Sequence, residues 1–398
     1  MTGRAAFVWD DELRHYDFGP GHPLAPVRVQ LAYRLIRDFK LLDNDDVDLL
    51  APSPSADVVD LLRVHDPAFI TAVMAASADP GAADPSFGLG TEDVPAFAGM
   101  HDASRHVCGA TMTAAAAIAD GGYDHAVNVA GGLHHSGPRA ASGFCVYNDI
   151  GVAISWLLEQ GYERIAYVDV DAHHGDGVQA IFWDEPRVMT ISLHETGRTL
   201  FPGSGFPEET GGPGALGASV NVALPPGIGD VEWLRAFEAV VPEVLEAFNP
   251  QILVTQQGCD SHTEDPLAHL ALTIDGQRRT YELLHEFAHR YADGKWLAVG
   301  GGGYEWLEVV PRAWTHLSAI AFGTPIPNET EVPEAYVEFV HRALGRPTPG
   351  RMTDGRTIPE VCWDARLNPE DPVDRAILAT RRATFPLLGI DLDDWHGM

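Results

Sequence analysis

Residues 169–177 read DVDAHHGDG, which places three aspartates and two histidines within eight residues. They directly follow the apolar run 165–168, which predicts a buried strand. Asp171 and His173 are two positions apart, so their side chains project to the same side of extended backbone. This spacing suits two ligands of one metal ion. Capping of a helix that begins near Gly177 would explain one aspartate, but not three aspartates together with two histidines.

A third metal ligand is expected from Asp260, in the segment QQGCDSH. Two carboxylates and one imidazole would leave a coordination position for water, which is typical of catalytic rather than structural sites. Zinc is the expected ion, with Fe²⁺ and Mn²⁺ as alternatives for so oxygen-rich a set. Water on such an ion is acidified towards a pKa of ~7, which provides hydroxide at neutral pH.

The adjacent histidines His134 and His135 are candidates for general acid and base catalysis. Vicinal histidines both need polar partners, and Asp169 and Asp176 are available to hold their rings. The sequence does not say which histidine is the base, and one of them could be purely structural.

Tyr304 follows four consecutive glycines, which permit close approach of the backbone to a ligand. A phenol at this position could donate a hydrogen bond to a developing oxyanion. The glycine run alternatively suggests phosphate binding, but residues 300–306 (GGGGYEW) fit neither GxxxxGK[ST] nor GxGxxG.

Strands and helices are expected to alternate from about residue 125, which indicates βαβ units and a parallel sheet covered by helices on both faces. Because parallel strands end at one edge, chemical groups that follow different strands can converge there. The expected strands are 5–9, 125–130, 165–168, 188–191, 220–224, 252–255 and 296–299. The expected helices are 26–39, 58–76, 97–119, 149–160, 231–248, 273–292 and 305–321.

The chain has 398 residues and a net charge of −31, which argues against binding to nucleic acid. The charge suits cationic partners such as basic protein tails, and solubility would explain it equally well. No signal peptide or membrane span is expected. The four cysteines are far apart and form no CxxC pair, which indicates reduced thiols and a cytoplasmic protein.

Several motifs together resemble the zinc-dependent histone deacetylases and their bacterial relatives. They are GGLHHSGPRAASGFCVYND, VDVDAHHGDGVQAIFW, VMTISLHE, LFPGSG, GCDSH and GGGGY. The resemblance covers roughly residues 5–320, and residues 16–28 and 258–270 look most like the bacterial acetoin-utilisation deacetylases. It implies the single-domain arginase/deacetylase α/β fold, with a parallel sheet of about eight strands and the active site at the carboxyl ends of the strands. We expect a metal-dependent deacetylase domain at 1–325 and an irregular extension at 326–398, packed on the core.

The resemblance also implies residue roles. The catalytic and metal-binding matches are the zinc ligands Asp171, His173 and Asp260, the tandem histidines His134 and His135, their partners Asp169 and Asp176, and the carbonyl-polarising Tyr304. The substrate-binding matches are the aromatic channel walls Phe144 and Phe201, the rim residues Gly143 and Asp93, and the pocket residue Leu267. Arg28 resembles the arginine of an internal acetate channel, and a structural potassium ion would bind near Asp169, Asp171, His173, Ser192 and Leu193.

The implied reaction is hydrolysis of Nε-acetyl-lysine on a protein to lysine and acetate. For the bacterial branch the substrate would be a metabolic enzyme such as an acyl-CoA synthetase. The substrate protein, the native metal, the oligomeric state and the role of the extension stay open at this point.

Three other functions compete with this one. An acetylpolyamine amidohydrolase should place an acid near the slot, at the position of Leu267. The acidic residues Glu92 and Asp93 nevertheless leave this function as an alternative. A dimanganese hydrolase of the arginase kind would need an aspartate at His262. A non-catalytic lysine-binding module would have no need of His134, His135 or Tyr304.

Overall fold

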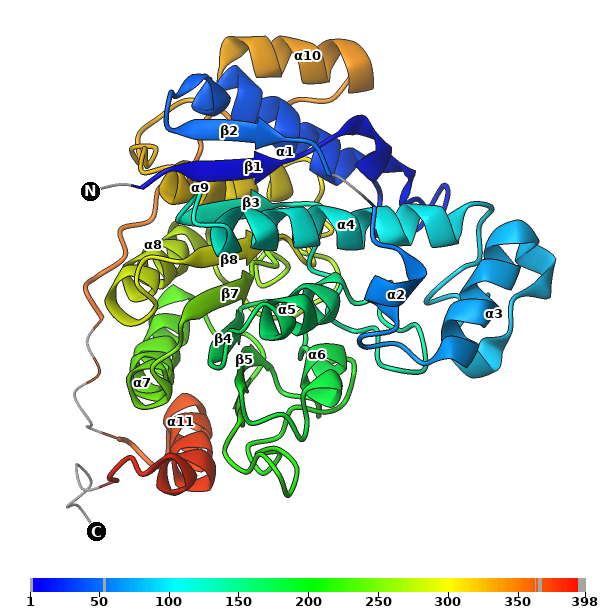
Figure 1. Cartoon of the computed structure of the whole chain (residues 1–398). Helices are drawn as coiled ribbons and strands as arrows, with labels where there is room; N and C mark the ends of the chain where they lie inside the picture. Colours follow the sequence, from blue (N-terminus) through cyan, green and yellow to red (C-terminus); the bar gives the residue numbers. More distant parts are fainter. Residues whose placement is uncertain (1–2, 53–54, 362, 364–366, 393–398) are drawn as a thin grey trace.

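A computed structural model describes residues 3–52, 55–361, 363 and 367–392. Eight strands form one sheet in the order β2-β1-β3-β8-β7-β4-β5-β6, and every neighbouring pair is parallel (Figure 1). The strands are β1 (Ala5–Val8), β2 (Val47–Leu50), β3 (His125–Asn128), β4 (Ile165–Asp169), β5 (Val188–Glu195), β6 (Ser219–Leu224), β7 (Ile252–Gln256) and β8 (Trp296–Val299). The expected fold class, a single α/β domain around a parallel sheet of eight strands, is confirmed.

Helices cover both faces of the sheet, as a parallel sheet requires. On one face α4 packs on β3, β1 and β8, with α5 beside it. On the other face α1, α9, α8, α7 and α11 lie side by side, each against the next or against the sheet. The helices are α1 (Val27–Asp38), α2 (Val58–Leu61), α3 (Pro67–Ala78), α4 (Met100–Ala119), α5 (Asp149–Glu159), α6 (Asp176–Ile181), α7 (Asp230–Phe248), α8 (Ile274–Tyr291), α9 (Val310–Ala321), α10 (Glu334–Leu344) and α11 (Pro372–Thr384).

The central strands are short apolar runs that are buried along their whole length. Every residue of β4 (IAYVD), β7 (ILVTQ) and β8 (WLAV) is buried. The last residues of β4 and β7, Asp169 and Gln256, are polar and lie next to each other in the β4–β7 register. The apolar run of each strand thus ends directly before the polar residues of the site, which explains why the strand ends could be found from the sequence.

The structure differs from the expected elements at four places. The segment 58–76 forms two helices, because Pro67 begins α3 and Asp66 caps it by accepting a hydrogen bond from Ala68 N at 2.8 Å. Strand β2 was not expected, and β5 runs on through Glu195, so His194 lies within a strand. Helix α9 begins at Val310, five residues later than predicted, with proline in its first turn.

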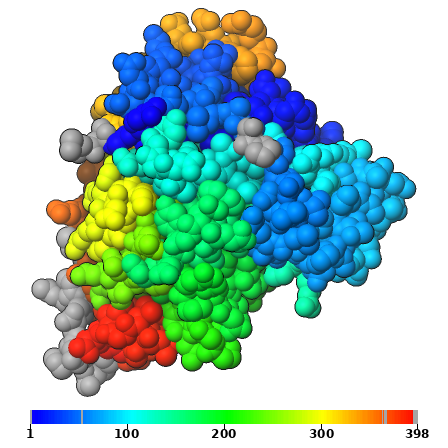
Figure 2. Space-filling model, viewed as in Figure 1, coloured from blue at the N-terminus to red at the C-terminus, as the bar shows by residue number. Residues whose placement is uncertain are grey.

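The C-terminal region is less irregular than expected, because α10 and α11 form within it. Figure 2 shows α10 at the top of the molecule beside the blue N-terminal segment and α11 at the bottom. α11 packs on β6 and α7: the Thr380 hydroxyl donates to Asn221 O at 2.6 Å, and Arg381 donates to Ala239 O at 2.7 Å. The division at residue 325 stays a prediction.

Cys108, Cys145 and Cys259 are buried free thiols, whereas Cys362 lies outside the described residues. Within the described ranges, no helix has both the length and the apolar character needed to cross a membrane.

Candidate metal centre and histidine pair

The predicted site residues meet at the carboxyl edge of the four neighbouring strands β3, β8, β7 and β4. The histidine pair follows β3, the Asp/His cluster follows β4, Asp260 follows β7 and Tyr304 follows β8. Four loops that are distant in sequence therefore converge because their strands are adjacent.

Asp171, His173 and Asp260 form a compact and buried set of metal-ligand atoms. One ligand atom from each residue lies within 4.8 Å of the other two. His173 Nδ1 lies 3.1 Å from Asp171 Oδ1 and 2.9 Å from Asp260 Oδ2. The three side chains thus face a common point, as ligands of one ion would.

The electrostatics of these residues fit a cation. Burial and the negative charge of Asp171 raise the pKa of Asp260 to about 7. Two carboxylates in a water-poor site repel each other, and a bound cation would remove that repulsion. The set offers two oxygens and one nitrogen, which suits a borderline divalent ion.

Two glycines allow the carboxylates their positions. A Cβ atom at Gly302 would overlap the Asp260 carboxylate, and one at Gly258 would overlap that of Asp171. Gly302 N instead donates to Asp171 Oδ2 at 2.7 Å, and Ala172 N donates to Asp260 Oδ1 at 2.8 Å. The backbone therefore takes part in orienting both carboxylates.

His134 and His135 are each held by an aspartate. His134 Nδ1 lies 2.7 Å from Asp169 Oδ2, and His135 Nδ1 lies 2.6 Å from Asp176 Oδ1. Their Nε2 atoms are 3.0 Å apart, and both rings are buried. The partners expected from the sequence are therefore the ones in contact.

The two histidines have opposite proton affinities. Burial opposes protonation of His134, but the charges of Asp169 and Asp171 outweigh it and raise the pKa to about 9. Burial and the neighbouring His134 lower the pKa of His135 to about 4, although Asp176 acts in the other direction. The pair therefore favours a single shared positive charge near neutral pH.

Tyr304 lies beside the metal ligands with a neutral phenol. Burial, and then the charges of Asp260 and Asp171, raise its pKa well above the usual value, so the hydroxyl keeps its proton. Its backbone N donates to Asp265 Oδ2 at 2.7 Å. A protonated phenol at this place can donate a hydrogen bond to a carbonyl oxygen.

Two phenylalanines stand over the site. The Phe144 ring packs edge-on against Tyr304, with ring centroids 5.6 Å apart. The Phe201 ring packs edge-on against His135 at 5.0 Å, and 44% of Phe201 is exposed. One predicted channel wall, Phe144, therefore contacts the tyrosine, and the other, Phe201, contacts the histidine pair.

The remaining predicted substrate and channel residues lie at three places around the site. At the surface, Asp93 Oδ2 accepts a hydrogen bond from Gly143 N at 2.8 Å. Half-buried Leu267 donates its N–H to Asp265 Oδ1 at 3.0 Å, which ties it to the carboxylate that holds Tyr304. Arg28 is buried behind the site and donates to Gly301 O at 2.7 Å.

The predicted monovalent-cation residues lie on β4 and β5 and the loop after β4. Asp169 and Ser192 are register partners, and the Ser192 hydroxyl contacts His194 Nδ1 at 2.8 Å. Leu193 is fully buried, and Asp171 N donates to Asp169 Oδ1 at 3.1 Å. The residues are thus neighbours, and potassium binding itself stays a prediction.

Three residues that position the site were not found from the sequence. The Tyr167 hydroxyl donates to Asp169 Oδ2 at 2.5 Å, and Gln256 Nε2 donates to Asp171 Oδ2 at 2.7 Å. The Tyr16 hydroxyl donates to Phe144 O at 2.7 Å. Tyr167 precedes Asp169 by two residues, so strand alternation could have placed both on one side.

His262 occupies the position where a second metal would need an aspartate. It is buried, and its Nε2 lies 2.9 Å from Asp354 Oδ2. This interaction with the C-terminal region occupies the imidazole, which weakens the case for a dimanganese centre.

Comparison with known proteins agrees with this geometry. The model of the histone deacetylase domain matches residues 22–321. The acetoin utilization protein AcuC of Bacillus subtilis (strain 168) is 43% identical over 315 residues, which are 79% of this chain and 81% of that protein. AcuC of Staphylococcus aureus (strain MSSA476) is 36% identical over 327 residues, with 82% and 83% covered.

The crystal structure of a histone deacetylase homologue complexed with SAHA is similar throughout. It superimposes with a TM-score of 0.80 at 28% sequence identity and covers 95% of this chain and 100% of that one. The matched domain, residues 22–321, also includes every site residue from Arg28 to Tyr304. The chain therefore belongs to the histone deacetylase family, as a hydrolase of the AcuC type.

Proposed function

We propose that this hydrolase is a zinc-dependent lysine deacetylase, which hydrolyses Nε-acetyl-lysine on proteins to lysine and acetate. One observation carries the proposal: two aspartate-held histidines lie directly beside an Asp/His/Asp set, with a neutral tyrosine near the same carboxylates. A non-catalytic lysine-binding module would gain nothing from this arrangement.

Asp171, His173 and Asp260 would hold the ion, which when bound supplies Lewis-acid activation of water and of the acetyl carbonyl. Zinc suits the set, and Fe²⁺ and Mn²⁺ compete with it for the same ligands. A potassium ion near Ser192 and Leu193 would support the loop after β4.

The chain's own residues provide the proton chemistry. One histidine of the pair would take a proton from the attacking water, and the pair would return a proton to the leaving amine. Asp169 and Asp176 fix the ring orientations, since each accepts from a ring Nδ1. The Tyr304 phenol would donate to the carbonyl oxygen as negative charge develops on it.

The surroundings of the site favour an acetylated lysine side chain. Phe144 and Phe201 offer two aromatic surfaces for a neutral aliphatic stem. Asp93 is held at the surface by Gly143 and could bind the peptide backbone of a substrate. The position expected to carry an acid in a polyamine enzyme is the half-buried Leu267.

An acetylpolyamine amidohydrolase is the second candidate. Glu92 is exposed beside Asp93, and the net charge of −31 would attract a polycation. The same charge would attract lysine-rich protein segments. We place the activity in the cytoplasm, on an acetylated protein such as an acyl-CoA synthetase, without nucleic acid or membrane as a partner.

The chemistry is tested with Tyr304→Phe and Asp260→Asn. Tyr304→Phe should keep the ion and lose about 10²–10³ in kcat on an acetyl-lysine peptide, as is usual when an oxyanion donor is removed. Asp260→Asn should bind one equivalent of zinc less than the wild-type protein. Full turnover by Tyr304→Phe would refute the role of the phenol, and an unchanged zinc content of Asp260→Asn would refute the ligand set.

A further inference from the structure

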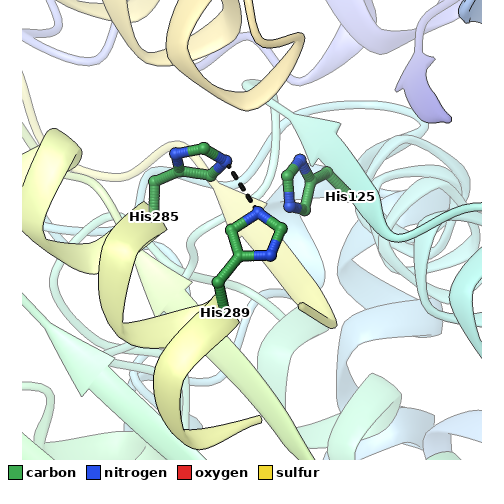
Figure 3. Close-up of side chains that lie close together, drawn as sticks. All are labelled: His125, His285 and His289. Atoms are coloured by element: carbon green, nitrogen blue, oxygen red, sulfur yellow. Dashed lines mark hydrogen bonds between the residues drawn. The ribbon is translucent and has the colours of Figure 1, made fainter. Parts of the chain in front are cut away.

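Three histidines meet at a second place in the molecule (Figure 3). His125 is the first residue of β3, and His285 and His289 lie in the last two turns of α8. One ring nitrogen from each lies within 4.8 Å of the other two. Because His125 begins its strand, this cluster belongs to the amino edge of the sheet, opposite the edge that carries the metal centre.

The three rings face one another. His285 and His289 are four residues apart and therefore project from the same side of the helix. Their Nε2 atoms lie 3.1 Å apart, as the dashed line in Figure 3 marks. The His125 ring stands 4.8 Å and 5.1 Å from the other two ring centroids.

His125 is oriented like a metal ligand. It is 1% exposed, and its Nδ1 lies 2.6 Å from the carbonyl oxygen of Ala321, the last residue of α9. The carbonyl can only accept, so Nδ1 carries the proton and the lone pair is on Nε2. A backbone carbonyl that fixes the tautomer in this way is a common partner of metal-binding histidines.

His125 Nε2 has no hydrogen-bond partner among the described residues. A buried polar atom left without a partner costs free energy, so a native protein usually satisfies it. The side chain can neither turn away nor reach solvent, because Nδ1 is held by Ala321 and the ring is enclosed. The unused lone pair is therefore available to a ligand between the rings.

His125 and His285 favour the neutral imidazole. Burial lowers the pKa of His125, and burial together with the other two histidines lowers the pKa of His285 to about 4. The one acidic group that acts on His125 is Asp124, and it has less effect than burial. Neutral imidazole is the form that coordinates metals.

The turn after α8 directs His289 into the cluster. Gly294 has a φ of +80°, and a Cβ atom there would stand 3.0 Å from His289 Nδ1. His289 is thus placed with Nδ1 towards this glycine and Nε2 towards His285. A larger residue at position 294 would push the ring away.

We propose that His125, His285 and His289 bind a divalent transition-metal ion. Three imidazoles suit zinc, copper and nickel, and they leave one coordination position on the exposed side of His289 for water or another ligand. The ion would connect β3 to α8, and through the Ala321 carbonyl it would act on the end of α9. This site is separate from the Asp171 centre and does not depend on the proposed reaction.

The experiment counts bound zinc in protein without an affinity tag. Metal-stripped protein is loaded with Zn²⁺, desalted and measured by mass spectrometry of the element. The wild-type protein should hold two equivalents, and His289→Ala should hold one with unchanged acetate release. His341→Ala, an exposed histidine in the last turn of α10, is the matched control and should hold two. Equal zinc contents in the wild-type protein and His289→Ala would overturn the proposal.

A second measurement tests whether the ion is bound by all three histidines or by His285 and His289 alone. The protein is loaded with Cu²⁺, and the electron paramagnetic resonance spectrum of His289→Ala is subtracted from that of the wild-type protein. The difference should show three coordinated imidazole nitrogens. Two nitrogens would mean that His125 does not bind, and the three-histidine site would be wrong. The readout avoids mutation of His125, whose burial makes misfolding of a variant a separate cause of metal loss.

Discussion

His134 Nε2 and His135 Nε2 lie 3.0 Å apart, and the opposite nitrogen of each ring contacts a different aspartate. Two protonated rings at this distance would repel each other in a buried site, so the pair holds one proton more easily than two. The pKa of His134 is raised and that of His135 is lowered, which gives the shared proton to the ring beside Asp169.

Asp169→Asn should move the alkaline limb of the pH profile to lower pH. The charge of Asp169 helps to raise the pKa of His134 to about 9, so its removal lets burial lower that pKa. We expect a shift of about one pH unit or more, from the usual effect of a charge in contact. The measurement is kcat/KM of deacetylation against pH, with Glu92→Gln as a control of exposed charge. An unmoved alkaline limb in Asp169→Asn would contradict the assignment.

Gly302→Ala should weaken zinc binding at the Asp171 centre. Its methyl group would overlap the Asp260 carboxylate, which then has to turn away from His173. We expect a loss of affinity of about 10–100-fold, the size seen when supports of metal ligands are removed. Competition with a chromophoric chelator measures the zinc affinity of each variant. Gly350→Ala, where a Cβ atom meets nothing within 4 Å, should behave as the wild-type protein does. Equal affinities in the two variants would show that the glycine is not needed.

Asp93→Ala should raise KM for an acetylated peptide and leave KM for a small acetylated amine unchanged. Asp93 is fixed by Gly143 N at the surface, where it could accept a hydrogen bond from the backbone of a peptide substrate. The loss of a charged hydrogen bond is expected to raise KM about tenfold or more. The amide oxygen of Asp93→Asn can still accept from Gly143 N, so its KM for the peptide should lie between those of the wild-type protein and Asp93→Ala. An equal rise for both substrates would point to a purely structural role.

Asp354→Asn should destabilise the protein at neutral pH. Burial opposes ionisation of Asp354, but the hydrogen bond from His262 and the charge of Arg312 lower its pKa strongly. A carboxyl with a lowered pKa stabilises the fold above its unfolded value near ~4, and this contribution disappears as the pH falls through the folded value. We expect the free energy of unfolding to fall by about 1–3 kcal/mol at pH 7, and this difference from the wild-type protein should shrink below about pH 4.

Urea unfolding of both proteins at a series of pH values measures this difference. Asp43→Asn changes an exposed carboxylate and should have no such effect. A difference between Asp354→Asn and the wild-type protein that is constant at every pH would contradict the ionic explanation. Since Asp354 joins the C-terminal region to the buried His262, the result also tests whether that region supports the loop after β7.

The sequence predicts the sheet edge and most of the site because the relevant residues follow buried, mainly apolar strands. Asp171 and His173 come directly after β4, where a change from apolar to ionisable residues is conspicuous. Tyr167 and Gln256 were missed because they lie within strands and act by supporting the aspartates. Strand alternation places Tyr167 on the same side as Asp169, but it does not distinguish a supporting residue from a core residue.

The elements that were missed have their own physical reasons. β2 (VDLL) is a short edge strand with an exposed leucine and an aspartate, so it carries no buried apolar run. α10 and α11 are flanked by residues rich in proline, aspartate and arginine, which hid their helical period. His125 and His285 are 160 positions apart, so only the packing of α8 on the sheet brings them together.

The most direct test of the account measures acetate release from an acetyl-lysine peptide and from acetylated polyamines, side by side. The protein is first stripped of metal and then assayed with and without added zinc. We predict that zinc restores turnover and that kcat/KM is higher for the peptide. Turnover that needs no metal would contradict the assigned centre, and higher kcat/KM for the polyamines would contradict protein deacetylation.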